Sequence, residues 1–224
     1  MKKLISFALA AAVLLPLHAE AQATVTANAG WLSQYYYRGI LQKTSSASAG
    51  LNVASGNFSA GTWAADVGDG SEVDLFGGVS LPLGESATVS LGGTGYFYTG
   101  DFDNTYLEGN LGVGLGIVSL AAALGTYDAP GDPKYFYLGI TAAQNGFFAT
   151  AATIAYNTGF GDALSDAFDK DLGGQYLQAG YGFSAADLDF TVSGLWNDSY
   201  LNFLYEGADE MTLIFGVSKT FSIQ

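Results

Sequence analysis

The chain repeats one unit along most of its length: a segment of about ten residues in which apolar side chains alternate with small or polar ones, then a turn. A period of two is typical of β-strands with two different faces. The turns alternate as well, because a short turn is followed by a longer, acidic loop. In a membrane-spanning barrel every strand has a lipid face and a lumen face, and successive loops lie on opposite sides. The pattern therefore predicts an all-β fold, a transmembrane up-and-down antiparallel β-barrel.

About twelve segments carry the period of two. They are residues 25–31, 51–53, 58–67, 72–81, 88–91, 106–113, 120–124, 136–142, 147–156, 176–183, 188–192 and 211–218. Residues 109–127 carry no charge and can alternatively be read as one membrane helix. The glycines in this stretch each weaken a helix by about 1 kcal/mol, so we favour a hairpin there.

The loops fall into two sets, which indicate the orientation of the barrel. The short set comprises residues 55–57, 82–86, 114–117, 144–146 and 184–187. The long set comprises residues 39–46, 67–72, 99–104, 127–134, 157–175 and 197–210, and it carries most of the acidic residues. With the N- and C-termini in the periplasm, every long loop would be extracellular, as in outer-membrane barrels. A soluble β-sandwich is the alternative, although it gives no reason for this sorting.

The N-terminus has the features of an export signal. Basic residues at Lys2 and Lys3 precede an apolar stretch over residues 4–17, and Ala21 and Ala23 form a small-x-small cleavage site. We therefore expect a cleaved signal peptide over residues 1–23 and an outer-membrane barrel over residues 24–224. An uncleaved membrane anchor is the alternative, but its apolar core is short for a spanning helix.

Charge and composition exclude several classes of function. The chain has 21 acidic and 7 basic residues, a formal net charge of −14, and no basic patch, which excludes nucleic acid as a partner. It has no cysteine, and its one histidine lies in the expected signal peptide, so thiol chemistry and a Ser-His arrangement are absent from the barrel. We therefore predict a protein that is not an enzyme and uses no cofactor. An outer-membrane lipase or acyltransferase remains the enzymatic alternative.

The loop over residues 157–175 is the most acidic one, with aspartates at 162, 166, 169 and 171. Carboxylates at this spacing are compatible with calcium, but the segment lacks the glycine and the closing glutamate of an EF-hand loop. We expect no metal site. A solvated acidic loop with one helical turn through Leu164 and Phe168 is the interpretation we prefer.

Three short motifs resemble one known family. Residues 35–42 read Y-Y-Y-R-G-I-L-Q, residues 61–65 read G-T-W-A-A, and residues 73–78 read V-D-L-F-G-G. They resemble the TorF-type porins of proteobacteria, also described as the Gcw_chp family of unknown function, although Leu41 and Ala65 stand where polar residues are expected. The resemblance implies an outer-membrane barrel that forms a pore, and it implies no particular substrate.

Strand alternation predicts a set of charged residues that face the lumen. Arg38 is the only arginine, and it shares the parity of Asn28, Gln34 and Tyr36. The same reasoning turns Asp66, Asp74, Glu108 and Asp189 inward, because Trp63 with Val67, Leu75, Leu107 and Phe190 are assigned to the lipid face. One hypothesis is a constriction in which Arg38 among carboxylates filters solutes by charge. The alternative is a structural ion pair between Arg38 and Asp66 or Asp74.

Aromatic residues gather near the ends of the expected strands. We interpret them as interfacial girdles rather than as a platform for stacking a ligand. They are Trp31, Tyr35, Tyr36, Tyr37, Tyr96, Tyr98, Tyr127, Tyr135, Tyr137, Tyr156 and Trp196.

Together these features predict a porin-like channel of the Gram-negative outer membrane, for passive diffusion of small solutes or ions through a narrow polar lumen. The alternative is a non-conducting structural or adhesive barrel that binds partners through acidic extracellular loops. Expected partners are outer-membrane lipid and lipopolysaccharide, the barrel-assembly machinery, and small solutes or ions. The sequence leaves a homo-oligomer open.

Overall fold

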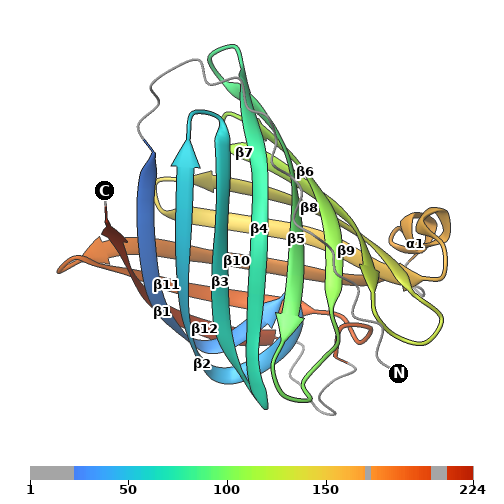
Figure 1. Ribbon diagram of the computed structural model, residues 1–224. Coiled ribbons are helices and arrows are strands. Elements are labelled where there is room, and N and C mark those ends of the chain that lie inside the picture. Colours follow the sequence, from blue (N-terminus) through green and yellow to red (C-terminus); the bar gives the residue numbers. More distant parts are fainter. Residues whose placement is uncertain (1–22, 170–172, 203–210, 224) are drawn as a thin grey trace.

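The computed structural model describes residues 23–169, 173–202 and 211–223, which form one closed barrel of twelve antiparallel strands (Figure 1). Each strand pairs with the next one in sequence, and the last pairs with the first. The predicted fold class is therefore confirmed. No helix within these ranges is long and apolar enough to cross a membrane. The expected signal peptide lies almost wholly outside the described residues.

The strands have the following bounds. They are β1 (Thr24–Tyr37), β2 (Ile40–Ser55), β3 (Phe58–Gly68), β4 (Gly70–Leu83), β5 (Ala87–Tyr98), β6 (Tyr106–Leu115), β7 (Val118–Tyr127), β8 (Lys134–Gln144), β9 (Phe147–Asn157), β10 (Gly174–Ala185), β11 (Leu188–Asn197) and β12 (Met211–Ser222). β6 and β7 form the predicted hairpin within residues 109–127. The helix α1 (Phe160–Asp166) includes Leu164 but ends before Phe168, and it packs on β8 and β9.

Every second residue of a strand points away from the lumen, and these outward residues are mostly apolar, so the outer face of the wall is apolar. On β6, Leu107 is 54% exposed, whereas the neighbouring Glu108 is buried. The same contrast separates Leu75 from Asp74 on β4. Exposed apolar side chains of this kind recur around the barrel, at Leu51, Leu91, Leu111, Leu124, Ile140, Leu177, Leu213 and Phe215.

The turns are sorted between the two ends of the barrel. Turns of two or three residues join β2 to β3, β4 to β5, β6 to β7, β8 to β9 and β10 to β11, at the end where β1 begins and β12 ends. At the other end, the predicted loops over 99–104 and 127–134 are present, and so are the described parts of the loops predicted over 157–175 and 197–210. The prediction of long loops over residues 39–46 and 67–72 is wrong. Residues 40–46 belong to β2, and a single residue separates β3 from β4.

The β1–β2 hairpin leaves the wall and enters the barrel. β1 pairs with β12 only as far as Leu32, and β2 pairs with β3 only from Ser48 onward, so residues 33–47 pair with each other alone. Figure 1 shows the two blue strands bending across the lower end of the barrel. Three hydrogen bonds fix the bend, from Trp31 to Ser45, from Ser46 to the Asp66 carbonyl, and from the Phe215 amide to Ser33. We call residues 33–47 the inserted hairpin.

Candidate lumen constriction and vestibule

The tip of the inserted hairpin is a two-residue turn at Arg38 and Gly39. Both residues have positive φ, 48° and 83°, as a type I′ turn requires. Gly39 is needed for a second reason, because a Cβ there would lie 2.8 Å from Leu201 Cδ1. Arg38 therefore lies inside the barrel because the whole hairpin is inserted, and not through strand parity.

An ion pair anchors the tip to β6. Arg38 Nη2 lies 2.9 Å from Glu108 Oε1, and the two side chains are only 12% and 1% exposed. Glu108 Oε1 also accepts from Tyr96 at 2.8 Å and from Asn110 at 2.6 Å, while Oε2 accepts from Tyr135 at 2.8 Å. The carboxylate is thus surrounded by donors. The partner of Arg38 is Glu108, rather than Asp66 or Asp74.

Aromatic rings enclose the Arg38 guanidinium. Its central carbon lies 4.3 Å from the centre of the Tyr137 ring, 4.9 Å from Tyr37 and 5.7 Å from Tyr135. Each distance is within the range of a cation–π contact. These contacts lower the cost of burying the charge and hold the guanidinium in one place.

Other contacts tie the hairpin to three further strands. Tyr35 donates to Glu72 on β4 at 2.6 Å, and Tyr36 donates to Thr212 on β12 at 3.2 Å. On β11, Asn197 Nδ2 donates to the Gly39 carbonyl at 2.7 Å. The hairpin thus spans the lumen and forms a constriction.

The two sides of this constriction differ in polarity. Between the hairpin and β8–β12, the space is filled by a buried, mainly apolar cluster, made of Ile40, Tyr135, Ile154, Tyr176, Leu195, Leu201 and Ile214. Toward β4–β6, the buried residues include Glu72, Asp74 and Glu108. The acidic side chains of the constriction therefore concentrate on the β4–β6 side, whereas uncharged polar residues such as Asn197 and Thr212 are buried on the other side.

The predicted lumen residues occupy different places. Arg38, Asp74 and Glu108 lie together at the constriction. Asp189 lies on the inward face of β11, near the short turns at the opposite end, where Ser184 donates to it at 2.6 Å. It is therefore not part of the constriction.

The inward assignment of Asp66 is wrong. Its side chain is 45% exposed and forms an ion pair with Lys43, whose ammonium holds the carboxylate at the rim. The error came from Trp63, which was assigned to lipid. Trp63 is paired with the buried Asp74 and packs edge-on against Tyr35, 5.5 Å between ring centres, so it points inward and Asp66 points outward.

The girdle interpretation is wrong for most of the tyrosines. Tyr35, Tyr96 and Tyr135 are buried inside the barrel, and Tyr37, Tyr98, Tyr137 and Tyr156 pack there beside them. Glu72 belongs to the same alternating set as Asp74, but it is also the last residue of the loop expected over 67–72 and was not counted among the lumen-facing charges; it is buried on β4. Giving Glu72 the inward face assigned to Asp74 would have found it.

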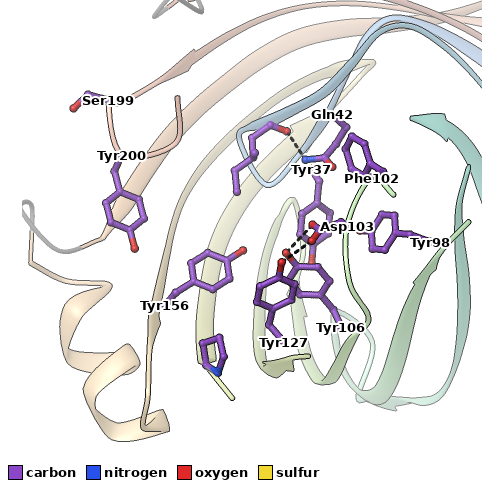
Figure 2. Close-up of a pocket in the computed structure, with 12 residues that line it drawn as sticks. Tyr37, Gln42, Tyr98, Phe102, Asp103, Tyr106, Tyr127, Tyr156, Ser199 and Tyr200 are labelled. Atoms are coloured by element: carbon purple, nitrogen blue, oxygen red, sulfur yellow. Dashed lines mark hydrogen bonds between the residues drawn. The ribbon is translucent and has the colours of Figure 1, made fainter. Parts of the chain in front are cut away.

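A pocket of about 930 Å³ opens on the long-loop side of the hairpin, and we call it the vestibule. Figure 2 shows its ring of aromatic side chains, which includes Tyr98, Phe102, Tyr106, Tyr127, Tyr156 and Tyr200, with Tyr37, Ile40 and Gln42 from the hairpin. Asp103 accepts from Tyr106 at 2.9 Å and from Tyr127 at 2.7 Å. Burial raises the pKa of Tyr200 in the loop after β11, so its phenol stays neutral. The vestibule is aromatic, hydroxyl-rich and acidic.

The lumen on the other side of the hairpin is lined by small polar residues. Thr94 bonds to Asn110, Thr141 to Thr150, and Gln178 to Ser193, each pair bridging neighbouring strands. No group of three or more acidic, histidine or cysteine side chains within the described ranges is arranged to hold a metal ion. Asp171, part of the acidic loop, lies outside those ranges.

Comparison with known proteins agrees with this architecture. A family model described as a bacterial protein of unknown function (Gcw_chp) matches residues 17–221. No curated protein is significantly similar in sequence.

Among solved structures, the KdgM porin matches with a TM-score of 0.54 at 7% identity, covering 89% of this chain and 99% of that one. The KdgM porin in complex with disordered oligogalacturonate gives 0.53 at 8% identity, with the same coverage. A structure from a study of the in-meso crystallisation of membrane proteins gives 0.54 at 11% identity, covering 89% and 84%. At such low identity the likeness shows the fold alone.

Proposed function

This chain belongs to the Gcw_chp family of bacterial proteins of unknown function, and we propose that it is a porin-like channel of the TorF type in the Gram-negative outer membrane. Small solutes or ions would cross it by passive diffusion. The proposal includes a cleaved signal peptide over residues 1–23, periplasmic termini, and contact with lipid, lipopolysaccharide and the barrel-assembly machinery.

One observation carries the proposal: a closed wall with an apolar outer face and a polar inner face. A wall without a free edge leaves no strand unpaired in hydrocarbon, and alternation gives the lumen a polar lining. Small polar side chains on the short-turn side of the hairpin leave room for water. The vestibule provides a second open space, lined mainly by aromatic rings, on the long-loop side.

The inserted hairpin separates these two spaces, so we place the permeation path along its polar side. Glu72, Asp74 and Glu108 line that side, whereas the opposite side is packed with apolar residues. An acidic constriction disfavours anions. The oligogalacturonate bound by the KdgM porin is a polyanion, and we do not propose it as a solute here.

The filled side of the constriction favours a second candidate, a non-conducting barrel that binds a partner through its acidic loops. Buried residues such as Tyr135, Ile154 and Leu195 leave little free space there.

Two measurements test the channel. A heat-modifiable shift on gel electrophoresis shows whether purified protein folds as a barrel in detergent. Folded protein in planar lipid bilayers should then give discrete conductance steps in potassium chloride. Folded protein without such steps would support the non-conducting barrel and overturn the channel.

A further inference from the structure

Two buried carboxylates on β4 have oxygen atoms without a partner. Glu72 is fully buried, and Asp74 is 9% exposed. Glu72 Oε1 accepts from Tyr35, but Glu72 Oε2 and Asp74 Oδ1 have no hydrogen-bond partner among the described residues. Buried oxygens of this kind carry a large desolvation cost unless a proton or a cation binds them.

Within the described ranges, the basic side chains do not neutralise these carboxylates. Arg38 is paired with Glu108, and Lys43 with Asp66 at the rim. Lys134 is paired with Asp132, and Lys219 lies near the end of β12, over the ring of Phe221. The constriction thus holds three carboxyl groups for one guanidinium.

Glu72 and Asp74 lie on the same, lumen-facing side of β4. Residues two apart on a strand point the same way, about 7 Å apart along it. Asp74 is within electrostatic range of both Glu72 and Glu108. On β5, Tyr98 lies opposite Glu72 and Tyr96 lies opposite Asp74. The Tyr35 hydroxyl bonds to Glu72 and the Tyr96 hydroxyl to Glu108.

We propose that Glu72 and Asp74 form a binding site for a cation that passes through the constriction. The ligands are all oxygen atoms, which suits a hard cation, either an alkali-metal ion or the ammonium group of an organic solute. No group of three or more acidic, histidine or cysteine side chains among the described residues is arranged to hold a metal, and this fits transient binding. The inference deepens the proposed function, because it gives the channel a cationic substrate class.

Binding can be measured in detergent, independently of conduction. The thermal unfolding midpoint of the folded barrel is compared in potassium, methylammonium and N-methylglucamine chloride at equal ionic strength. We expect the two small cations to raise the midpoint by about 2–4 °C over the bulky one. Asp74→Asn should remove this difference, whereas Glu85→Gln, in the exposed turn at the other end of β4, should retain it. If Asp74→Asn does not fold, Glu72→Gln makes the same test.

If only potassium raises the unfolding midpoint, the site binds an alkali-metal ion. If only methylammonium raises it, the site binds an ammonium group. Equal midpoints in all three salts, or a shift that persists in Asp74→Asn, would overturn the proposal.

The second readout is the reversal potential in a potassium chloride gradient across a planar bilayer. The wild-type channel should prefer potassium to chloride, and Asp74→Asn should reduce this ratio several-fold while Glu85→Gln keeps it. Midpoints that depend on the cation in a protein that does not conduct would refute the channel but keep the site. Conduction without cation preference would refute the site but keep the channel.

Discussion

Replacing Glu108 by glutamine should release the tip of the inserted hairpin from β6. The carboxylate accepts four hydrogen bonds, from Arg38, Tyr96, Asn110 and Tyr135, at 2.6 to 2.9 Å. Removing one partner of a buried ion pair generally costs about 3–5 kcal/mol, because the other charge is left uncompensated. Arg38 would keep its contacts with the rings of Tyr37, Tyr135 and Tyr137, each worth about 0.5–2 kcal/mol. We therefore expect a loss near the lower limit, about 3 kcal/mol.

The assay is urea unfolding of the barrel in lipid vesicles, followed by tryptophan fluorescence. Trp63 packs against Tyr35 of the hairpin, so it reports on the constriction. The matched control is the double variant Arg38→Gln with Glu108→Gln, in which no buried charge is left alone. It should recover more than half of the lost stability. A loss below about 1 kcal/mol for the single variant, or no recovery in the double variant, would refute the anchoring role of this pair.

Three other substitutions test the wall and the hairpin. Gly39→Ala should displace the hairpin tip and change the single-channel conductance, because its Cβ would lie 2.8 Å from Leu201 and Tyr176. The control Gly116→Ala also has a positive φ, 57°, but its Cβ would meet no atom within 4 Å, so conductance should be unchanged. Gly125→Ala should lower the free energy of unfolding by about 1–3 kcal/mol, because its Cβ would lie 2.1 Å from Tyr135 Cζ, whereas Gly109→Ala, with no atom within 4 Å, should be neutral or slightly stabilising. Ile140→Arg should cost about 2–4 kcal/mol on the lipid face, and Thr141→Arg on the lumen face should cost less. Equal effects within a pair would contradict the assigned contact or face.

The wall of the barrel could be predicted from sequence because its cause is local. Each strand separates an apolar medium from a polar lumen, so the period of two appears in every segment and the number of strands follows. The faces of Leu75 and Leu107 were predicted on this basis. The inward assignment of Asp66 was wrong for a different reason. Parity divides the residues of a strand into two alternating sets, but it does not say which set faces the lumen. For β3 that choice depended on the assumption that Trp63 faces lipid.

The inserted hairpin could not be derived in the same way, because its contacts join positions far apart in sequence, such as Arg38 with Glu108 and Gly39 with Asn197. The sequence contains only a partial signal for it. Tyr35, Tyr36 and Tyr37 are three large side chains in succession, but such runs also occur at residues 96–98 and 135–137, in strands that stay in the wall. A strand in the wall has one lipid face, whereas a strand with both faces covered by protein has large side chains in succession. Tyr35 contacts β4 and Tyr36 contacts β12, so both faces of this segment are used inside the barrel. A run of large side chains at the end of a barrel strand is therefore not sufficient to predict insertion, which here depends on the distant contacts of the hairpin with β4, β11 and β12.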